Sequence, residues 1–112
     1  MSKANVESLK LKSEALLQQK QMLLNEVSGM AAGVSSEIEA KKRQVKLFEE
    51  NILPALRKNY QVMQLGYQQN TEQLFTLFDA WDTLNKTQTE YLNQLQQLLN
   101  MQVELERILE IK

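Results

Sequence analysis

The scarcity of helix-breaking residues is the feature that most constrains the fold of this chain. Its 112 residues include only 3 glycines and 1 proline. Glycine and proline supply much of the turn chemistry that a β-sheet needs, whereas the abundant Gln, Leu, Glu and Lys favour helix. Apolar residues recur at steps of three and four, as in Val27, Met30, Val34 and Ile38. Because this spacing places them on one face of a helix, the sequence predicts an all-α fold.

Two long helices account for nearly the whole chain, one over about residues 5–69 and the other over about residues 71–110. The sequence "NTEQ" between them has the form of an N-terminal cap. In such a cap Asn70 accepts a backbone N–H of the second helix, and Gln73 reaches back to the Asn70 amide. Glu72 then lies in the first turn, where the helix dipole favours an anion. The prediction is a long, coiled-coil-like antiparallel hairpin that forms a single domain.

Two features interrupt the first helix. Pro54 lacks an N–H and crowds the carbonyl of Glu50, so a kink is expected there. Glycines and a capping-box pattern over residues 29–35 leave two interpretations open. A break there produces a bundle of three helices instead of two. Alternatively, small residues form a face on which another helix packs closely: Gly29, Ala32, Gly33 and Ser36.

The predicted hairpin has arms of unequal length. A continuous helix of ~65 residues spans roughly 95–100 Å, and one of ~40 residues spans about 60 Å. Some 35–40 Å of the first helix, including Leu16-Leu17 and Leu23-Leu24, therefore lacks an antiparallel partner. Self-association, a missing part of the protein or a fold-back over residues 29–35 is expected to cover it.

Charge and composition exclude several classes of function. A net charge of -1 argues against a nucleic-acid partner. Acidic neighbours largely cancel the one basic cluster, Lys41-Lys42-Arg43 with Lys46, so this cluster is expected to be a solvated helix face. The chain has no Cys and no His, which removes zinc-finger ligand sets, thiol nucleophiles and imidazole bases. No carboxylate pairing or glycine-rich phosphate loop is present. We therefore predict no catalytic activity, no metal and no cofactor.

No export signal or membrane span is recognisable. Apolar runs fall short of the ~20 residues that cross a bilayer as a helix. The start, "MSKANVESLK", lacks an apolar signal segment. If the natural protein is exported, the chain is expected to be a fragment of a larger protein.

The predicted turn carries a string of residues that resembles the periplasmic tip of TolC-like outer-membrane efflux channels: Tyr67, Asn70, Thr71, Leu74, Leu77, Asp79, Ala80 and Leu84. Upstream, "NILPALRKNYQVMQLGY" is similar to the Ile-Leu-Pro segment of the family branch linked to metal-cation and drug pumps. Downstream, "YLNQLQQLLNMQVELERIL" resembles the family's closing run. The chain departs from the family in having Asn70 at the tip glycine, and Glu72 where some members place a basic residue.

The resemblance implies a fold and a function. Three such chains form a membrane β-barrel, continued by a helical tunnel through the periplasm of a Gram-negative bacterium. Each chain has two repeats, and each repeat has one long helix and two shorter ones. The present chain corresponds to the helical hairpin of the second repeat, and a shorter helix absent from it would cover the rest of the long helix. The implied function is export of small molecules or metal cations with an inner-membrane pump and a periplasmic adaptor.

The resemblance also implies roles for single residues. Tyr67, Asn70, Thr71 and Glu72 form the tip that contacts the adaptor. Asp79 matches a family acid that lines the pore constriction in several members, although an exposed acid in the second turn of a helix is the alternative.

The aromatic residues after the turn and the function as a whole each have a second interpretation. Phe75, Phe78 and Trp81 are expected to pack between helices, with contact to the adaptor as the alternative. In place of a channel segment, the chain is alternatively a soluble coiled-coil scaffold or the adaptor's own hairpin. The isolated fragment is expected to self-associate.

Overall fold

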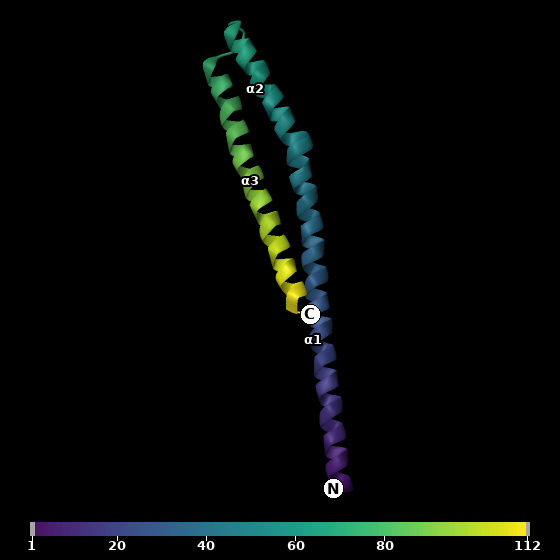
Figure 1. Ribbon diagram of the computed structural model, residues 1–112. Helices are drawn as coiled ribbons and strands as arrows, with labels where there is room; N and C mark the ends of the chain where they lie inside the picture. Colours follow the sequence, from purple (N-terminus) through teal and green to yellow (C-terminus); the bar gives the residue numbers. More distant parts are fainter. Residues whose placement is uncertain (1, 112) are drawn as a thin grey trace.

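The computed structural model describes residues 2–111, apart from the side chain of residue 111. Helix α1 (Lys3–Leu47), the π-turn η1 (Phe48–Ile52) and helix α2 (Leu53–Gln68) follow one another in a single arm. Helix α3 (Leu74–Ile111) returns antiparallel to that arm (Figure 1). The rod is 99 Å long and 16 Å across, which confirms the predicted hairpin and its length.

Helix α1 is continuous through its two glycines. It begins after Ser2, whose hydroxyl oxygen accepts the Asn5 N–H at 3.4 Å. A Cβ built on Gly29 or Gly33 meets nothing within 4 Å, so no part of this chain approaches closely there. The three-helix alternative with a break over residues 29–35 is therefore wrong. Glycine costs a helix only about 1 kcal/mol relative to alanine, and the strong helix formers on both sides outweigh that cost.

The predicted kink near Pro54 is confirmed and takes the form of the π-turn. The Leu53 N–H donates to the Phe48 carbonyl, five residues back instead of four. Proline has no N–H and clashes with the carbonyl one turn before it, so a wider turn directly ahead of Pro54 relieves the conflict. The rod changes direction at this point (Figure 1).

The π-turn also rotates the buried face by one residue. Val45 and Leu53 are both buried and lie eight positions apart, where an uninterrupted heptad pattern has seven. Helical spacing in the sequence predicts that the apolar stripe continues through Ile52, Leu56, Tyr60, Met63 and Tyr67. Ile52 is only half-buried, and Tyr67 is exposed while Gly66 beside it is buried. Leu56, Tyr60 and Met63 are half-buried as the spacing predicts, so the prediction was wrong only at Tyr67, the last position of the stripe.

The core is one seam between the two arms. At the end far from the turn, Ile108 of α3 packs against Val27 and Ala31 of α1. A second cluster contains Ile38, Val45 and Leu98. Leu53, Ala80 and Leu84 continue the buried seam toward the turn.

One lysine links α1 to α3. Lys41 Nζ donates to Gln94 Oε1 at 2.6 Å and to Gln97 Oε1 at 2.9 Å. The remainder of its basic cluster is solvated as predicted, with Lys42 3.5 Å from Glu39. Lys41 differs from that prediction, because its amine is turned toward the other arm.

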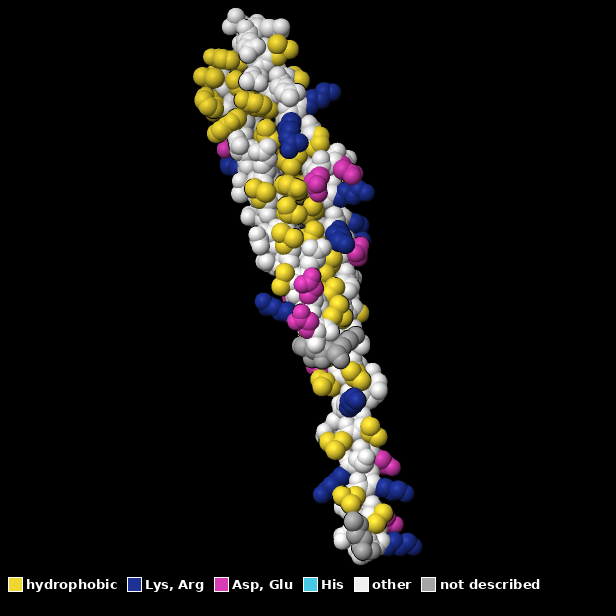
Figure 2. Space-filling model, viewed as in Figure 1, with side chains coloured by type: hydrophobic (Ala, Val, Ile, Leu, Met, Phe, Trp, Pro, Cys, Tyr) yellow, Lys and Arg dark blue, Asp and Glu magenta, His cyan; other side chains and the backbone are white. Residues whose placement is uncertain are grey.

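The first part of α1 has no antiparallel partner. Residues 3–26, which we call the overhang, extend past the end of α3 over roughly 36 Å (Figures 1 and 2). Their large apolar side chains are 37–70% exposed: Val6, Leu9, Leu11, Leu16, Leu17, Met22, Leu23 and Leu24. Within the described residues, no helix is long and apolar enough to cross a membrane. The lopsided hairpin that the sequence predicts is thus present.

Candidate interaction site at the hairpin tip

The turn between α2 and α3 is built around one carbonyl oxygen. Asn70, two residues after the end of α2, adopts a left-handed conformation with φ 60°. The chain then turns back, so that the Thr71 and Glu72 N–H groups both donate to the Gly66 carbonyl, at 2.8 and 3.2 Å. The Thr71 hydroxyl donates to the same oxygen at 3.0 Å. These bonds satisfy a helix-end carbonyl, in the manner of a left-handed C-terminal cap.

Gly66 is the residue that allows this close return. A Cβ added to it lies 2.6 Å from Glu72 Cγ and 3.2 Å from the Thr71 hydroxyl oxygen. Only a residue without a side chain fits there unless Glu72 moves. Gly66 was not predicted from the sequence. The sequence nevertheless contains a signal for this turn, because a glycine lies four residues before Asn70. Asparagine adopts the left-handed conformation more readily than most other non-glycine residues.

The predicted cap of the second helix was wrong. Helix α3 begins at Leu74, and the Gln73 carbonyl accepts the Leu77 N–H. Asn70 therefore ends α2 and does not start α3. Glu72 lies in the turn, ahead of the first turn of α3. Asn is favoured both at helix N-caps and in left-handed turns, so its position alone did not separate the two roles.

The turn brings the four predicted tip residues together at one end of the rod. Tyr67 in the last turn of α2 is 42% exposed. Asn70 and Thr71 are exposed, and Glu72 is half-buried against Gly66. The side chains of Tyr67, Asn70 and Thr71 are therefore accessible to another molecule at the apex. Glu72, in contrast, already contacts Gly66 within the turn.

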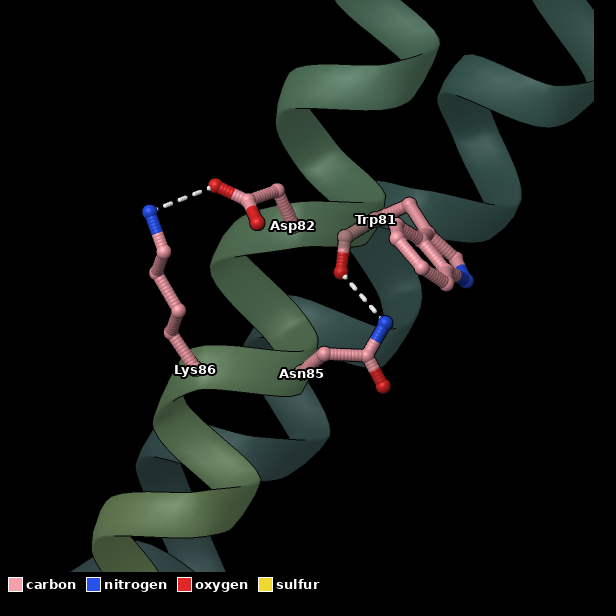
Figure 3. A network of polar contacts seen from close by, with 4 residues as sticks. All are labelled: Trp81, Asp82, Asn85 and Lys86. Carbon is pink, nitrogen blue, oxygen red and sulfur yellow. Dashed lines mark hydrogen bonds and ion pairs between the residues drawn. The ribbon is translucent and has the colours of Figure 1, made fainter.

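Asp79 lies on the outer side of α3 and is exposed. Its charge adds to the stronger effect of Asp82, whose hydrogen bond and charge raise the pKa of Lys86 above its ordinary value. Lys86 Nζ lies 2.8 Å from Asp82 Oδ2 (Figure 3). The group contains two carboxylates and one ammonium, so this surface keeps a net negative charge at neutral pH.

Trp81 lies on another face of α3 from that acidic group. Figure 3 shows its indole directed away from Asp82 and Lys86, while the Asn85 amide donates to the Trp81 carbonyl at 3.0 Å. The polar and aromatic surfaces near the tip are therefore separate.

The aromatic residues after the turn do not pack inside the hairpin. Phe75 is 81% exposed, Phe78 59% and Trp81 50%, so the expectation that they pack between helices was wrong for this chain. With Leu74 they form the aromatic patch, which is visible where apolar side chains gather near the tip in Figure 2. Leu74, Phe78 and Trp81 also line a shallow hollow of about 180 Å³ with Tyr60 and Leu77.

The patch is exposed because the only other arm lies on one side of α3. Ala80 and Leu84 are buried on the side of the other arm, and a rod only 16 Å across has no further layer to cover the remaining faces of α3. Helical spacing in the sequence puts Trp81 on the same stripe as Leu84, but in the structure Ala80 is buried and Trp81 is exposed.

Searches of protein-family models, of curated proteins and of solved structures found no match to this chain. The site therefore rests on the geometry of the hairpin itself.

Proposed function

We propose that the hairpin is a segment of the periplasmic tunnel of a trimeric outer-membrane efflux channel. In this role it exports small molecules or metal cations passively, together with an inner-membrane pump and a periplasmic adaptor. The tip residues Tyr67, Asn70, Thr71 and Glu72 contact the adaptor, and Asp79 lines the pore.

The observation that carries the proposal is the lopsided rod with its turn at Asn70. A tunnel wall requires long, narrow elements that reach across a gap, and the rod is 99 Å long and 16 Å across. A wall element also requires apolar faces that its neighbours cover. This hairpin exposes such faces at both ends, in the overhang and in the aromatic patch. The residues that resemble the channel family occupy the apex and the first turns of α3.

Asp79 provides the first test. A carboxylate ring in a narrow pore attracts cations, so removing its charge lowers cation conductance. Asp79→Asn in the intact trimeric channel should reduce single-channel cation conductance and cation preference in a planar bilayer. Glu104→Gln is the matched control, because Glu104 is an exposed acid of α3 far from the turn. Unchanged conductance in the Asp79 variant would remove this residue from the pore.

Glu72 provides the second test. Charge reversal by Glu72→Lys at the apex should weaken chemical cross-linking between the tip and the adaptor's helical hairpin, because complementary charge governs such encounters. Glu14→Lys, at the opposite end of the rod, should leave cross-linking unchanged. Equal cross-linking in the wild type and the Glu72 variant would contradict adaptor binding at the tip.

A further inference from the structure

Two hollows lie next to each other along the groove between α2 and α3. The first is the apolar hollow of about 180 Å³ near the tip, lined by Tyr60, Leu74, Leu77, Phe78 and Trp81. The second has a volume of about 230 Å³ and is lined by Leu53, Arg57, Gln88, Tyr91 and Leu92. Each alone is smaller than the roughly 300–1,000 Å³ of typical small-molecule sites, whereas the two together fall within that range. We call the two hollows together the side groove.

Both hollows open on the same side of the hairpin. Arg57 and Tyr60 lie one helical turn apart on α2, and Trp81 and Gln88 lie one heptad apart on α3. Figure 3 shows that the Trp81 indole is on the side of α3 turned away from Asp82. One heptad of helix spans roughly 10 Å, so the side groove is an elongated surface of about that length.

The two ends of the side groove differ in chemistry. The end near the tip combines the rings of Tyr60, Phe78 and Trp81 with two leucines, and no charged side chain lines it. Aromatic rings pack best against other rings, in offset or edge-to-face contacts. The other end contains the Arg57 guanidinium, the Gln88 amide and the phenol of Tyr91. The surface therefore suits a ligand with an aromatic body and a polar end.

The charge at the polar end favours an anion. Arg57 and Lys58 are the two charged residues of α2, and both are basic. Among the described residues, no carboxylate lies within ion-pair distance of Arg57. Glu90 is two residues from Gln88, about 200° around α3, and accepts a hydrogen bond from the Gln94 amide at 2.8 Å. The Arg57 guanidinium is thus available for a carboxylate or sulfonate, which it can bind through two parallel hydrogen bonds.

We propose that the side groove binds small aromatic acids. The ring system of the ligand lies in the apolar hollow, and its carboxylate or sulfonate binds the Arg57 guanidinium. The Gln88 amide and the Tyr91 hydroxyl line the same hollow and can donate hydrogen bonds to the remaining acid oxygens. The inference concerns the side groove alone and does not depend on the proposed function.

Two dyes with the same ring system test the requirement for an acid. Anilinonaphthalene sulfonate carries a sulfonate, and phenylnaphthylamine has the same rings without it. Trp81 is the single tryptophan of the chain, so quenching of its emission reports binding in the side groove. Dye bound to the overhang lies roughly 40 Å or more from Trp81 and quenches it little. Both dyes should quench Trp81, and added salt should weaken only the sulfonate, because salt screens the exposed charge of Arg57.

A substitution of Arg57 tests the polar end. Arg57→Gln should lower affinity for the sulfonate dye about fivefold and leave affinity for the neutral dye within about twofold. The matched control is Lys58→Gln, which removes the neighbouring positive charge of α2 but lines neither hollow. This control should alter either affinity less than about twofold.

A substitution of Phe78 tests the apolar end. Phe78→Ala removes a ring that lines the hollow and should lower affinity for both dyes about fivefold. The matched control is Phe75→Ala, because Phe75 is 81% exposed and does not line the hollow. This control should leave both affinities within about twofold. Circular dichroism checks that the variants remain helical, as expected for exposed positions.

Four results overturn the proposal. The first is that the sulfonate dye does not quench Trp81, and the second is that Arg57→Gln weakens the two dyes equally or not at all. The third is equal loss of affinity in the Phe78 and Phe75 variants. The fourth is a dimer in sedimentation that Phe78→Ala dissociates, which would assign the side groove to a second copy of the chain.

Discussion

The two parts of α1 share one helix and one heptad pattern, yet they differ in what covers them. The paired part, residues 27–47, buries Val27, Ala31, Ile38 and Val45 against α3. The overhang carries more leucines on the same helix and buries none of them. Local propensity and periodicity therefore decide that a helix forms and which face is apolar, but only a second element turns that face into a core.

The largest effect should come from shifting the heptad pattern within the paired part. Deleting Gln44 rotates everything after it by about 100° relative to the seam and should destabilise the hairpin by more than ~3 kcal/mol in urea unfolding. Deleting Gln19 makes the same change in the overhang and should cost less than about 1 kcal/mol. Similar losses of stability for the two deletions would contradict the distinction between the paired part of α1 and the overhang.

The π-turn provides a second test of the heptad register, because it already contains one residue more than an α-helical turn. Deleting Asn51 together with Pro54→Ala should restore a uniform helix with Val45 and Leu53 in phase. The stability of this variant should stay within about 1 kcal/mol of the wild type. A loss as large as that of the Gln44 deletion would show that the π-turn is not a one-residue insertion in the seam.

Truncating single apolar side chains should produce the same contrast between the paired part and the overhang, with smaller changes in stability. Ile38→Ala removes a buried side chain and should cost about 2–3 kcal/mol. Leu17→Ala removes one that is 64% exposed and should change stability by no more than about 0.5 kcal/mol. Hydrogen exchange should likewise show protected amides near Ile38 and faster exchange in the overhang.

Glycine substitutions compare the turn with the interior of α1. Gly66→Ala places a Cβ against Glu72 and should destabilise by about 1–2 kcal/mol, measured by thermal unfolding. Adding Glu72→Gly should recover part of the loss. Gly33→Ala meets no neighbour and should stabilise by about 0.5–1 kcal/mol. The opposite signs distinguish a required glycine from a tolerated one.

The smallest effect concerns the outer face of α3. Asp82→Asn should lower the Lys86 pKa toward its ordinary value, because it removes the hydrogen bond and the charge that raise it. Asp79→Asn should lower that pKa less. A raised lysine pKa stabilises the fold below the unfolded-state value and loses that contribution as pH rises through the folded-state value. NMR titration of the Lys86 amine measures both shifts, and equal shifts would contradict the dominant role of Asp82.

Much of the fold was predictable from the sequence because its signals are long. Helical spacing over dozens of residues and a single proline predicted the hairpin, its turn near Asn70 and its kink. Two details around the second part of the arm were not predictable from the spacing: the π-turn places one extra residue between Val45 and Leu53, and Gly66 instead of Tyr67 is buried near the end of α2.

The candidate site was harder to predict than the fold. Asn70 suits two opposite roles at a helix end, and the choice depends on whether Gly66 lets the chain return close to α2. The exposure of Phe75 and Trp81 depends on the number of helices that surround α3, and the sequence of one hairpin does not reveal that number.

The compact turn has a consequence for the order of folding. Its hydrogen bonds join residues that are only five or six positions apart, from Gly66 to Glu72, so closing it costs little chain entropy. Each successive contact between the arms then extends an existing zipper by a few residues, which favours fast assembly from this end. Residues 3–26 form no contact with α3 in this process, so their apolar side chains stay exposed when the hairpin is complete.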